Sequence, residues 1–227
     1  MFYNGIVFDF NGVLWLDEAL QMQVWRAYGQ QMRGSPVSDD ELAQYCLGVP
    51  SKTWLEYLAR HALSQQVVDR ITAEKEAEYR QLCLAQGEAF RLSPGAVELL
   101  DFLSARQIPR TIATSSEITN LAFFIEHLAL SRWFEVGKIV FDDGTYPGKP
   151  APDIYKRAVA ALDLTPTDCV VVEDSRSGIQ AAHAAGIGRV YALGPQKEHE
   201  RLARLPGVDG VIESLAELPV MALFGNK

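Results

Sequence analysis

The sequence predicts an α/β fold, with a doubly wound, Rossmann-like parallel sheet as its core and an inserted all-helical cap subdomain. Short, continuous apolar runs alternate with segments of helical period over most of the chain, a pattern typical of buried parallel strands joined by helices. One long stretch breaks this alternation and is helical throughout. We therefore expect an α/β core formed by residues 1–16 and 91–227, with a helical cap at residues 17–90.

The expected strands are apolar runs that stay continuous where a half-exposed strand would alternate. They are Gly5–Phe10, Ile108–Thr114, Cys169–Asp174 and Gly188–Leu193, with weaker candidates at Gly137–Phe141 and from Gly207 onward. The segments between them predict helices. These are Gly95–Arg106, Ile118–Leu128, Pro152–Leu162 and Gly178–Ala185, the last stopping at Gly186.

The expected cap is rich in Met, Gln, Glu, Ala and Leu, residues that suit helices. Apolar residues recur there at spacings of three and four. Ser38, Ser51 and Ser64 stand where helix N-caps are expected. The hinges should lie near residues 15–17 and 90–94.

The composition and net charge of the chain limit the kinds of molecule that it is expected to bind. A net charge of −8 over 227 residues weighs against nucleic acid or an anionic membrane. No apolar run approaches membrane-spanning length, and no leader-like N-terminus is evident. The three cysteines are odd in number and lack metal-ligand spacing, so we expect reduced thiols in a cytoplasmic protein. Its oligomeric state, monomer or homodimer, is left open.

Polar side chains gather where the expected strands end. In open α/β sheets, ligands bind beyond the carboxyl ends of the strands. The residues at these ends are Asp9, Thr114, Ser115, Ser116, Glu173 and Asp174. A Pro- and Gly-rich stretch, "GKPAPDIY", adds Lys149 ahead of a predicted helix.

These groups suit phosphate chemistry. Three converging carboxylates would repel one another unless a cation joined them, and oxygen ligands favour a hard ion such as Mg²⁺. Lys149 and the donors of Thr114 and Ser115 suit an oxyanion, above all phosphate. A phosphate beside Asp9 would be placed for in-line attack that forms an aspartyl-phosphate, with the metal neutralising charge.

Four stretches in order, "FDFNGVL", "IATSS", "GKPAPDIY" and "VVVEDSRSGIQAAHAAG", resemble the motifs of the haloacid dehalogenase superfamily. They are most similar to its phosphatase and β-phosphoglucomutase branch with a helical cap, and the resemblance runs from about Gly5 to Leu193. It implies a small phosphorylated metabolite as substrate. The implied roles are Asp9 as nucleophile, Thr114 as phosphate binder, Lys149 as charge-balancing lysine, and Asp174 with Glu173 as Mg²⁺ ligands.

The chain departs from the family at one position, because the usual Asp-x-Asp is here Asp9-Phe10-Asn11. In the family, the second aspartate protonates the leaving oxygen and then activates water. An amide can do neither, and such general acid–base help is typically about 10²–10⁴-fold in rate. The family's metal contact at this position is a main-chain carbonyl, so we expect Asn11 to keep metal and phosphate binding but to slow turnover.

Three explanations of Asn11 are open. The residue is natural and activity is confined to good leaving groups; or it is natural in a protein that binds a phosphoester without hydrolysing it; or it was introduced to trap a complex. All three predict the same binding site and differ in how fast it turns over.

Other reactions of the superfamily are alternatives. Phosphonate hydrolases lack the second aspartate and use a cap lysine as a Schiff base. Here the cap loop Leu47–Trp54 offers Lys52, which we expect to contact substrate without forming an imine, since nothing nearby in sequence would depress its pKa. A phosphoglucomutase-like enzyme would carry a cap histidine where Gln21 stands, so a hydrolase is preferred. Cap closure would exclude water and let Lys52 or Trp15, at the hinge, read the substrate, although packing is the favoured role of Trp15.

Overall fold

The computed structural model describes residues 2–45 and 51–225. The chain divides into two compact units. The core unit comprises Met1–Leu16 and Arg91–Lys227, and the helical unit comprises Asp17–Phe90.

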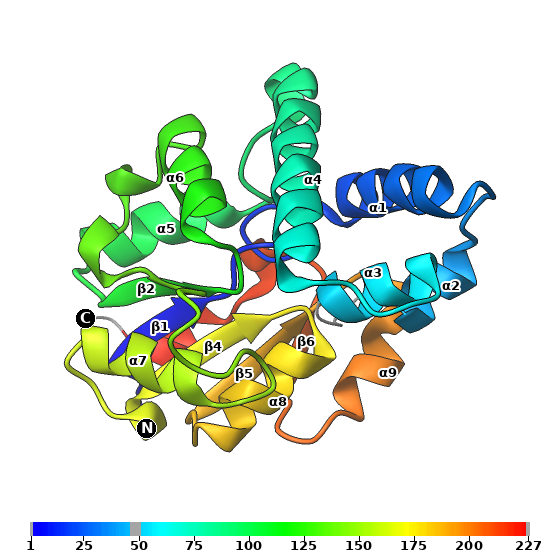
Figure 1. Ribbon diagram of the computed structural model, residues 1–227. Coiled ribbons are helices and arrows are strands. Elements are labelled where there is room, and N and C mark those ends of the chain that lie inside the picture. The colour runs from blue at the N-terminus through cyan, green and yellow to red at the C-terminus, as the bar shows by residue number, and fades with distance from the viewer. Residues whose placement is uncertain (1, 46–50, 226–227) are drawn as a thin grey trace. The chain divides into compact units, whose positions relative to one another are not determined.

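A six-stranded parallel sheet organises the core unit, in the order β3-β2-β1-β4-β5-β6 (Figure 1). The strands are β1 Gly5–Phe8, β2 Arg110–Thr114, β3 Val140–Phe141, β4 Cys169–Glu173, β5 Arg189–Leu193 and β6 Gly210–Ile212. The four inner strands are almost wholly buried, which explains their unbroken apolar runs. The predicted doubly wound α/β fold is confirmed.

Helices cover both faces of this sheet. They are α5 Ala96–Ala105, α6 Ile118–His127, α7 Asp153–Ala161, α8 Arg176–Ala184, α9 His199–Ala203 and α10 Val220–Phe224. Figure 1 shows α5 and α6 on one side of the sheet, with α7 and α8 on the other. Val7 packs with Ile154 of α7 and Ile179 of α8 in one core cluster. Toward α6, the ring of Phe10 lies 4.5 Å from that of Phe124.

Two strand ends fall earlier than predicted. β1 stops at Phe8 because the chain turns at once: the Phe10 carbonyl accepts the N–H groups of Leu14 at 2.8 Å and Trp15 at 3.0 Å. β4 stops at Glu173, and α8 begins two residues before its predicted start because Ser175 caps it, its hydroxyl accepting the Gly178 N–H at 3.0 Å. The polar residues of interest therefore stand in the first turns beyond the strands.

The helical unit contains α1 Glu18–Arg33, α2 Asp39–Tyr45, α3 Ser51–Ala59 and α4 Gln65–Ala85. Trp25, Trp54 and neighbouring aliphatic residues form its apolar core. Ser64 caps α4 as predicted, and Ser38 exchanges hydrogen bonds with Glu41 at the start of α2. Ser51 is instead the first residue of α3, so its predicted cap role is wrong.

The strand order places a topological switch point between β1 and β4. From β1 the chain first adds β2 and β3 on one side and then crosses to add β4, β5 and β6 on the other. Crossovers that leave two adjacent strands in opposite directions open a crevice at their carboxyl ends, where ligands bind in this class of sheet. The ends of β1 and β4 are therefore the place to look for a site.

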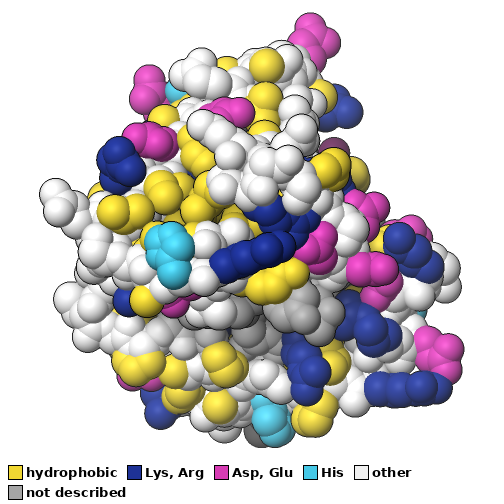
Figure 2. Space-filling view, turned by 45° about the vertical axis from the view of Figure 1, so that its right-hand side comes forward, with side chains coloured by type: hydrophobic (Ala, Val, Ile, Leu, Met, Phe, Trp, Pro, Cys, Tyr) yellow, Lys and Arg dark blue, Asp and Glu magenta, His cyan; other side chains and the backbone are white. Residues whose placement is uncertain are grey.

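The surface carries mixed charges (Figure 2), and the helices are not of the membrane-spanning kind within the part of the chain that the structure describes. On the face shown in Figure 2, lysines and arginines are interspersed with acidic and apolar side chains. Within residues 2–45 and 51–225, no helix has the length and apolar character needed to cross a bilayer.

Candidate active site

Lys149 connects the ends of three strands at the switch point. Its ammonium group donates to Asp9 Oδ1 at 2.6 Å and to Glu173 Oε1 at 2.6 Å. A weaker bond reaches the carbonyl of Ala113, in β2, at 3.3 Å. All three charged side chains are buried, with 7% of Lys149, 10% of Asp9 and none of Glu173 exposed. The loop that carries Lys149 therefore binds the first, second and fourth strands together through one cation.

Glu173 is held by hydrogen bonds on both of its oxygens. Besides Lys149, Oε1 accepts the Tyr155 hydroxyl at 2.7 Å. Oε2 accepts the N–H groups of Asp174 and Ser175 at 3.0 and 3.1 Å, and the Ser175 hydroxyl at 3.0 Å. A Cβ on Gly178 would lie 1.6 Å from Oε1, so this glycine leaves the space that the carboxylate fills. The arrangement fixes Glu173 as the counter-charge of Lys149.

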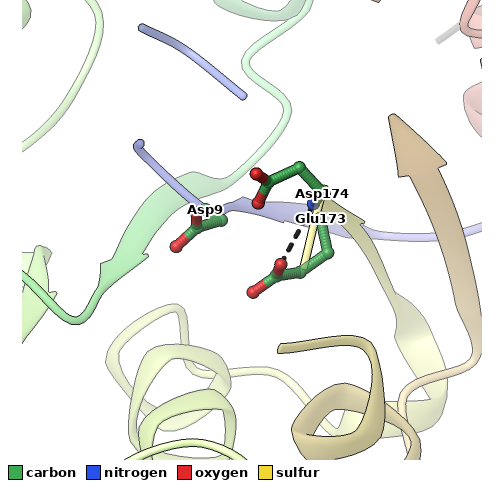
Figure 3. Close-up of side chains that lie close together, drawn as sticks. All are labelled: Asp9, Glu173 and Asp174. Atoms are coloured by element: carbon green, nitrogen blue, oxygen red, sulfur yellow. Dashed lines mark hydrogen bonds between the residues drawn. The ribbon is translucent and has the colours of Figure 1, made fainter. Parts of the chain in front are cut away.

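Asp174 completes a group of three carboxylates with Asp9 and Glu173. One oxygen of each lies within 4.8 Å of the other two. Figure 3 shows the side chains of Asp174 and Glu173 on opposite sides of the end of β4, with Asp9 beside them. Gly12 has a φ of +80°, and a Cβ there would fall 1.9 Å from Asp174 Oδ2. The glycine of "FDFNGVL" thus supplies both the turn and the room for Asp174.

The pKa values of the buried groups follow from burial and from their neighbours. Burial raises the pKa of Asp9 to about 7; Lys149 opposes this rise and the charge of Glu173 adds to it. Burial alone would raise the pKa of Glu173, but Lys149 and the hydrogen bonds bring it below its usual range. Burial alone would lower the pKa of Lys149, but Asp9 and Glu173 raise it above its usual value. Lys149 and Glu173 are therefore charged, whereas burial makes the ionised form of Asp9 costly.

The donor set fits a magnesium ion. With Asp9 ionised, the three carboxylates and one ammonium group carry a net charge of −2, which a divalent cation would balance. Such a cation would favour the ionised form of Asp9, whose pKa burial raises to about 7. All the donors are oxygens, the ligands that Mg²⁺ prefers. Asp9 and Asp174 would be the more available ligands, because the oxygens of Glu173 already accept five hydrogen bonds.

The predicted phosphate binders lie at the end of β2. Thr114 is almost fully buried, and its hydroxyl accepts the N–H of Ser116 at 3.1 Å. Ser115 is exposed. Ser116, which the sequence places in the same hydroxyl cluster without a separate role, donates its hydroxyl to Asn11 Oδ1 at 2.8 Å. The end of β2 and the turn after β1 are therefore joined directly.

Sequence reasoning missed the parts played by Ser116, Tyr155 and Gly12. Each lies inside a stretch quoted for its motif, next to or a few residues from a residue chosen for its charge or hydroxyl group. Tyr155 lies six positions after Lys149, on α7, and reaches Glu173 only in the folded chain. Membership of a motif was the only sign in the sequence that these three residues belong to the site, because their contacts form only in the folded chain.

The two predicted substrate contacts, Lys52 and Trp15, belong to different units of the chain. Lys52 is exposed on the first turn of α3 in the helical unit, and residues 46–50 of the predicted loop lie outside the described residues. Trp15 is 5% exposed, and its carbonyl accepts the Gly12 N–H at 2.7 Å. Substrate roles for both stay predictions.

Comparison with known proteins identifies the family. Residues 3–186 match the haloacid dehalogenase-like hydrolases. A phosphorylated carbohydrates phosphatase of Thermotoga maritima is 31% identical over 190 residues, covering 84% of this chain and 85% of the relative. The fructose-1-phosphate phosphatase of Escherichia coli is 31% identical over 194 residues, covering 83% of this chain and 95% of the relative. The crystal structure of a HAD hydrolase of family IA, variant 3, from Entamoeba histolytica superposes with a TM-score of 0.90 at 33% identity, covering 96% of each chain.

The chain belongs to the haloacid dehalogenase-like hydrolases, a family of enzymes. The resemblance of its four motifs is confirmed by this match. The buried Lys149 network stands where those motifs meet.

Proposed function

We propose that this chain is a Mg²⁺-dependent phosphatase that acts on a small phosphorylated metabolite through an aspartyl-phosphate on Asp9. The observation that carries the proposal is the pair of 2.6 Å bonds from Lys149 to Asp9 and Glu173 at the switch point of the sheet. The names of the two phosphatase relatives favour a phosphorylated sugar.

Each residue has a role in this proposal. A carboxylate oxygen of Asp9 attacks phosphorus. The phosphoryl oxygens are bound by donors of Thr114, Ser115, Lys149 and the Asn11 amide. Asp9, Asp174 and the main-chain carbonyl of Asn11 would hold Mg²⁺, with Glu173 completing the acidic group. When bound, the ion would neutralise charge that develops on the transferred phosphoryl group. Asn11 lowers the rate, because it can neither protonate the leaving oxygen nor activate water.

The two units have separate tasks in the proposal. The core unit is catalytic, and residues 17–90 act as a cap that excludes water and supplies Lys52 to the substrate. Trp15, at the boundary, is a second substrate contact. We place the enzyme in the cytoplasm as a monomer or homodimer, without nucleic acid or membrane as a partner.

Asn11 also favours a second candidate, a protein that binds a phosphoester without hydrolysing it. The same buried cation and hydroxyl groups would hold the ligand, and the missing proton carrier would protect it from turnover.

Phosphate release from a panel of phosphorylated sugars tests the proposal, with Mg²⁺ and with excess chelator. We expect Asn11→Asp to raise the rate by about 10²–10⁴-fold and Asp9→Ala to abolish activity in either background. Full activity in Asp9→Ala would refute the nucleophile. Tight phosphate binding with no hydrolysis by the original chain or by Asn11→Asp would select the binding protein instead.

A further inference from the structure

The carboxamide of Asn11 is fixed from two directions. Its Oδ1 accepts the hydroxyl of Ser116 at 2.8 Å, across 105 positions of sequence. Ser116 is itself tied to the end of β2, because its N–H donates to Thr114 Oγ1 at 3.1 Å. On the other side, the backbone of Asn11 belongs to the tight turn that the Gly12 N–H closes onto the Trp15 carbonyl at 2.7 Å.

This hydrogen bond assigns the two ends of the carboxamide. Because a serine hydroxyl donates to Oδ1, the oxygen of the amide faces Ser116 and the NH₂ group forms the other end of the side chain. An NH₂ group of this kind only donates hydrogen bonds and carries no exchangeable acid or base function near neutral pH. A carboxylate in the same place could accept the Ser116 bond equally well and still carry a proton on its second oxygen.

Building on the phosphatase activity proposed above, we propose that Ser116 is a positioning residue for Asn11, and that the pair restricts the site to phosphoryl donors whose leaving group departs as a stable anion. Acyl phosphates are the substrate class with this chemistry. The inference narrows the small phosphorylated metabolite by its leaving group, so a sugar-derived substrate would carry its phosphate on a carboxyl group and not on an alcohol.

The first half-reaction shows why the leaving group decides. An oxygen of Asp9 forms a bond to phosphorus, the bond from phosphorus to the leaving oxygen breaks, and its electron pair stays on that oxygen. A carboxylate released from an acyl phosphate needs no proton, whereas an alkoxide released from a sugar phosphate must take one in the same step. Asn11 cannot supply it, so only the second class loses the rate that general acid catalysis provides.

The second half-reaction is common to all donors. Water attacks phosphorus, the bond to Asp9 breaks and returns its carboxylate, and the proton of the attacking water passes to solvent without help from Asn11. A missing base therefore slows this step equally for every substrate. With a good leaving group the aspartyl-phosphate should form faster than it is hydrolysed, and should accumulate.

Steady-state kinetics with two donors test the substrate class. The ratio kcat/KM reports only steps up to the release of the first product, so it isolates formation of the aspartyl-phosphate. In the presence of Mg²⁺, we expect Asn11→Asp to raise kcat/KM for glucose 6-phosphate by about 10²–10⁴-fold, but for acetyl phosphate by less than about tenfold. A burst of acetate close to one equivalent per site should appear in the original chain alone. Equal gains on both donors, or no burst, would overturn the inference.

A second set of variants tests Ser116. Ser116→Ala should lower kcat/KM for acetyl phosphate by about fivefold to tenfold, the effect of one lost hydrogen bond, and Ser116→Thr should keep most of it. In an Asn11→Ala background, Ser116→Ala should have no further effect, because no amide is left to orient. Thr119→Ala, an exposed hydroxyl residue on α6, is the matched control. An equal loss in both backgrounds would show that Ser116 acts apart from Asn11.

The outcomes separate this inference from the phosphatase proposal. One outcome is that Asp9→Ala abolishes activity while Asn11→Asp raises kcat/KM equally for both donors. In that case the phosphatase proposal is supported and the leaving-group restriction is refuted. If Asp9→Ala keeps full activity on both donors, the phosphatase proposal itself is refuted.

Discussion

Replacing Lys149 with methionine removes one positive charge from a buried site that holds three carboxylates. The ammonium group lies 2.6 Å from an oxygen of Asp9 and 2.6 Å from an oxygen of Glu173. Methionine keeps much of the chain length but supplies no donor, so both carboxylates lose their cation at once. We expect the core unit to be strongly destabilised when no divalent metal is present.

The magnitude follows from the geometry. Breaking a buried ion pair by removing one partner typically costs about 3–5 kcal/mol, because it leaves an uncompensated buried charge. The oxygens of Asp9 and Glu173 lie within 4.8 Å of each other. Without the lysine, the repulsion of the two ionised groups over that distance is about 3.5 kcal/mol at an effective dielectric constant of about 20. Lys149 holds the pKa of Asp9 down to about 7, so its removal raises that pKa further, and the repulsion is full only at alkaline pH, where Asp9 stays ionised. There, both routes place the loss of unfolding free energy at about 3–5 kcal/mol.

Urea unfolding in the presence of a chelator, followed by circular dichroism, measures this loss. The control is Lys138→Met, whose amino group makes a 3.1 Å pair with Glu135 on the surface, where 37% and 70% of the two side chains are exposed. Exposed pairs contribute at most about 1 kcal/mol. Adding Mg²⁺ should stabilise Lys149→Met more than the original chain, because the cation replaces part of the lost charge. If Lys149→Met cost no more than Lys138→Met, the charge-balancing role of Lys149 would be wrong.

Three further changes test other parts of the structure. Tyr155→Phe removes the hydroxyl that donates to Glu173 Oε1 at 2.7 Å, and should cost about 1.5–3 kcal/mol in urea unfolding, as expected for a hydrogen bond to a charged group. Gly12→Ala puts a Cβ 1.9 Å from Asp174 Oδ2 at a φ of +80°, so it should displace that carboxylate and weaken Mg²⁺ binding by at least about tenfold, measured by calorimetry. Glu41→Gln should lower the melting temperature of the helical unit near neutral pH, because the charge-assisted bond from Arg33 to the Glu41 carboxylate is lost. The Arg33 bond holds the pKa of Glu41 well below its ordinary value of 4.5. The difference in melting temperature between the two proteins should therefore be full above about pH 4.5 and should shrink as the pH falls below it.

Each of these has an outcome that contradicts it. Unchanged stability in Tyr155→Phe would mean that Glu173 is held well enough by its other donors. Unchanged Mg²⁺ affinity in Gly12→Ala would remove Asp174 from the metal site. A melting difference for Glu41→Gln that stays constant from neutral pH to below pH 4.5 would show that the charge of Glu41 does not stabilise the unit.

The sequence by itself determined the class of fold and the chemistry of the candidate site. Buried parallel strands are apolar on both faces, so continuous apolar runs in the sequence predicted the strands β1, β2, β4 and β5. Ligand sites of this fold lie at strand ends, so Asp9 and Asp174 were found from position alone. The amide at position 11 was equally plain, because it depends on one residue's identity and on no contact.

Only the tertiary structure decided which groups meet and how each is held. Lys149 and Asp9 are separated by 140 positions, and Ser116 and Asn11 by 105. Such pairs are set by the order in which the crossovers place β2, β1 and β4 side by side, and no local period records that order. For the same reason, the sequence could not predict the five hydrogen bonds that hold Glu173 as the counter-charge of Lys149. Local patterns specify elements, whereas the packing of distant elements specifies the site.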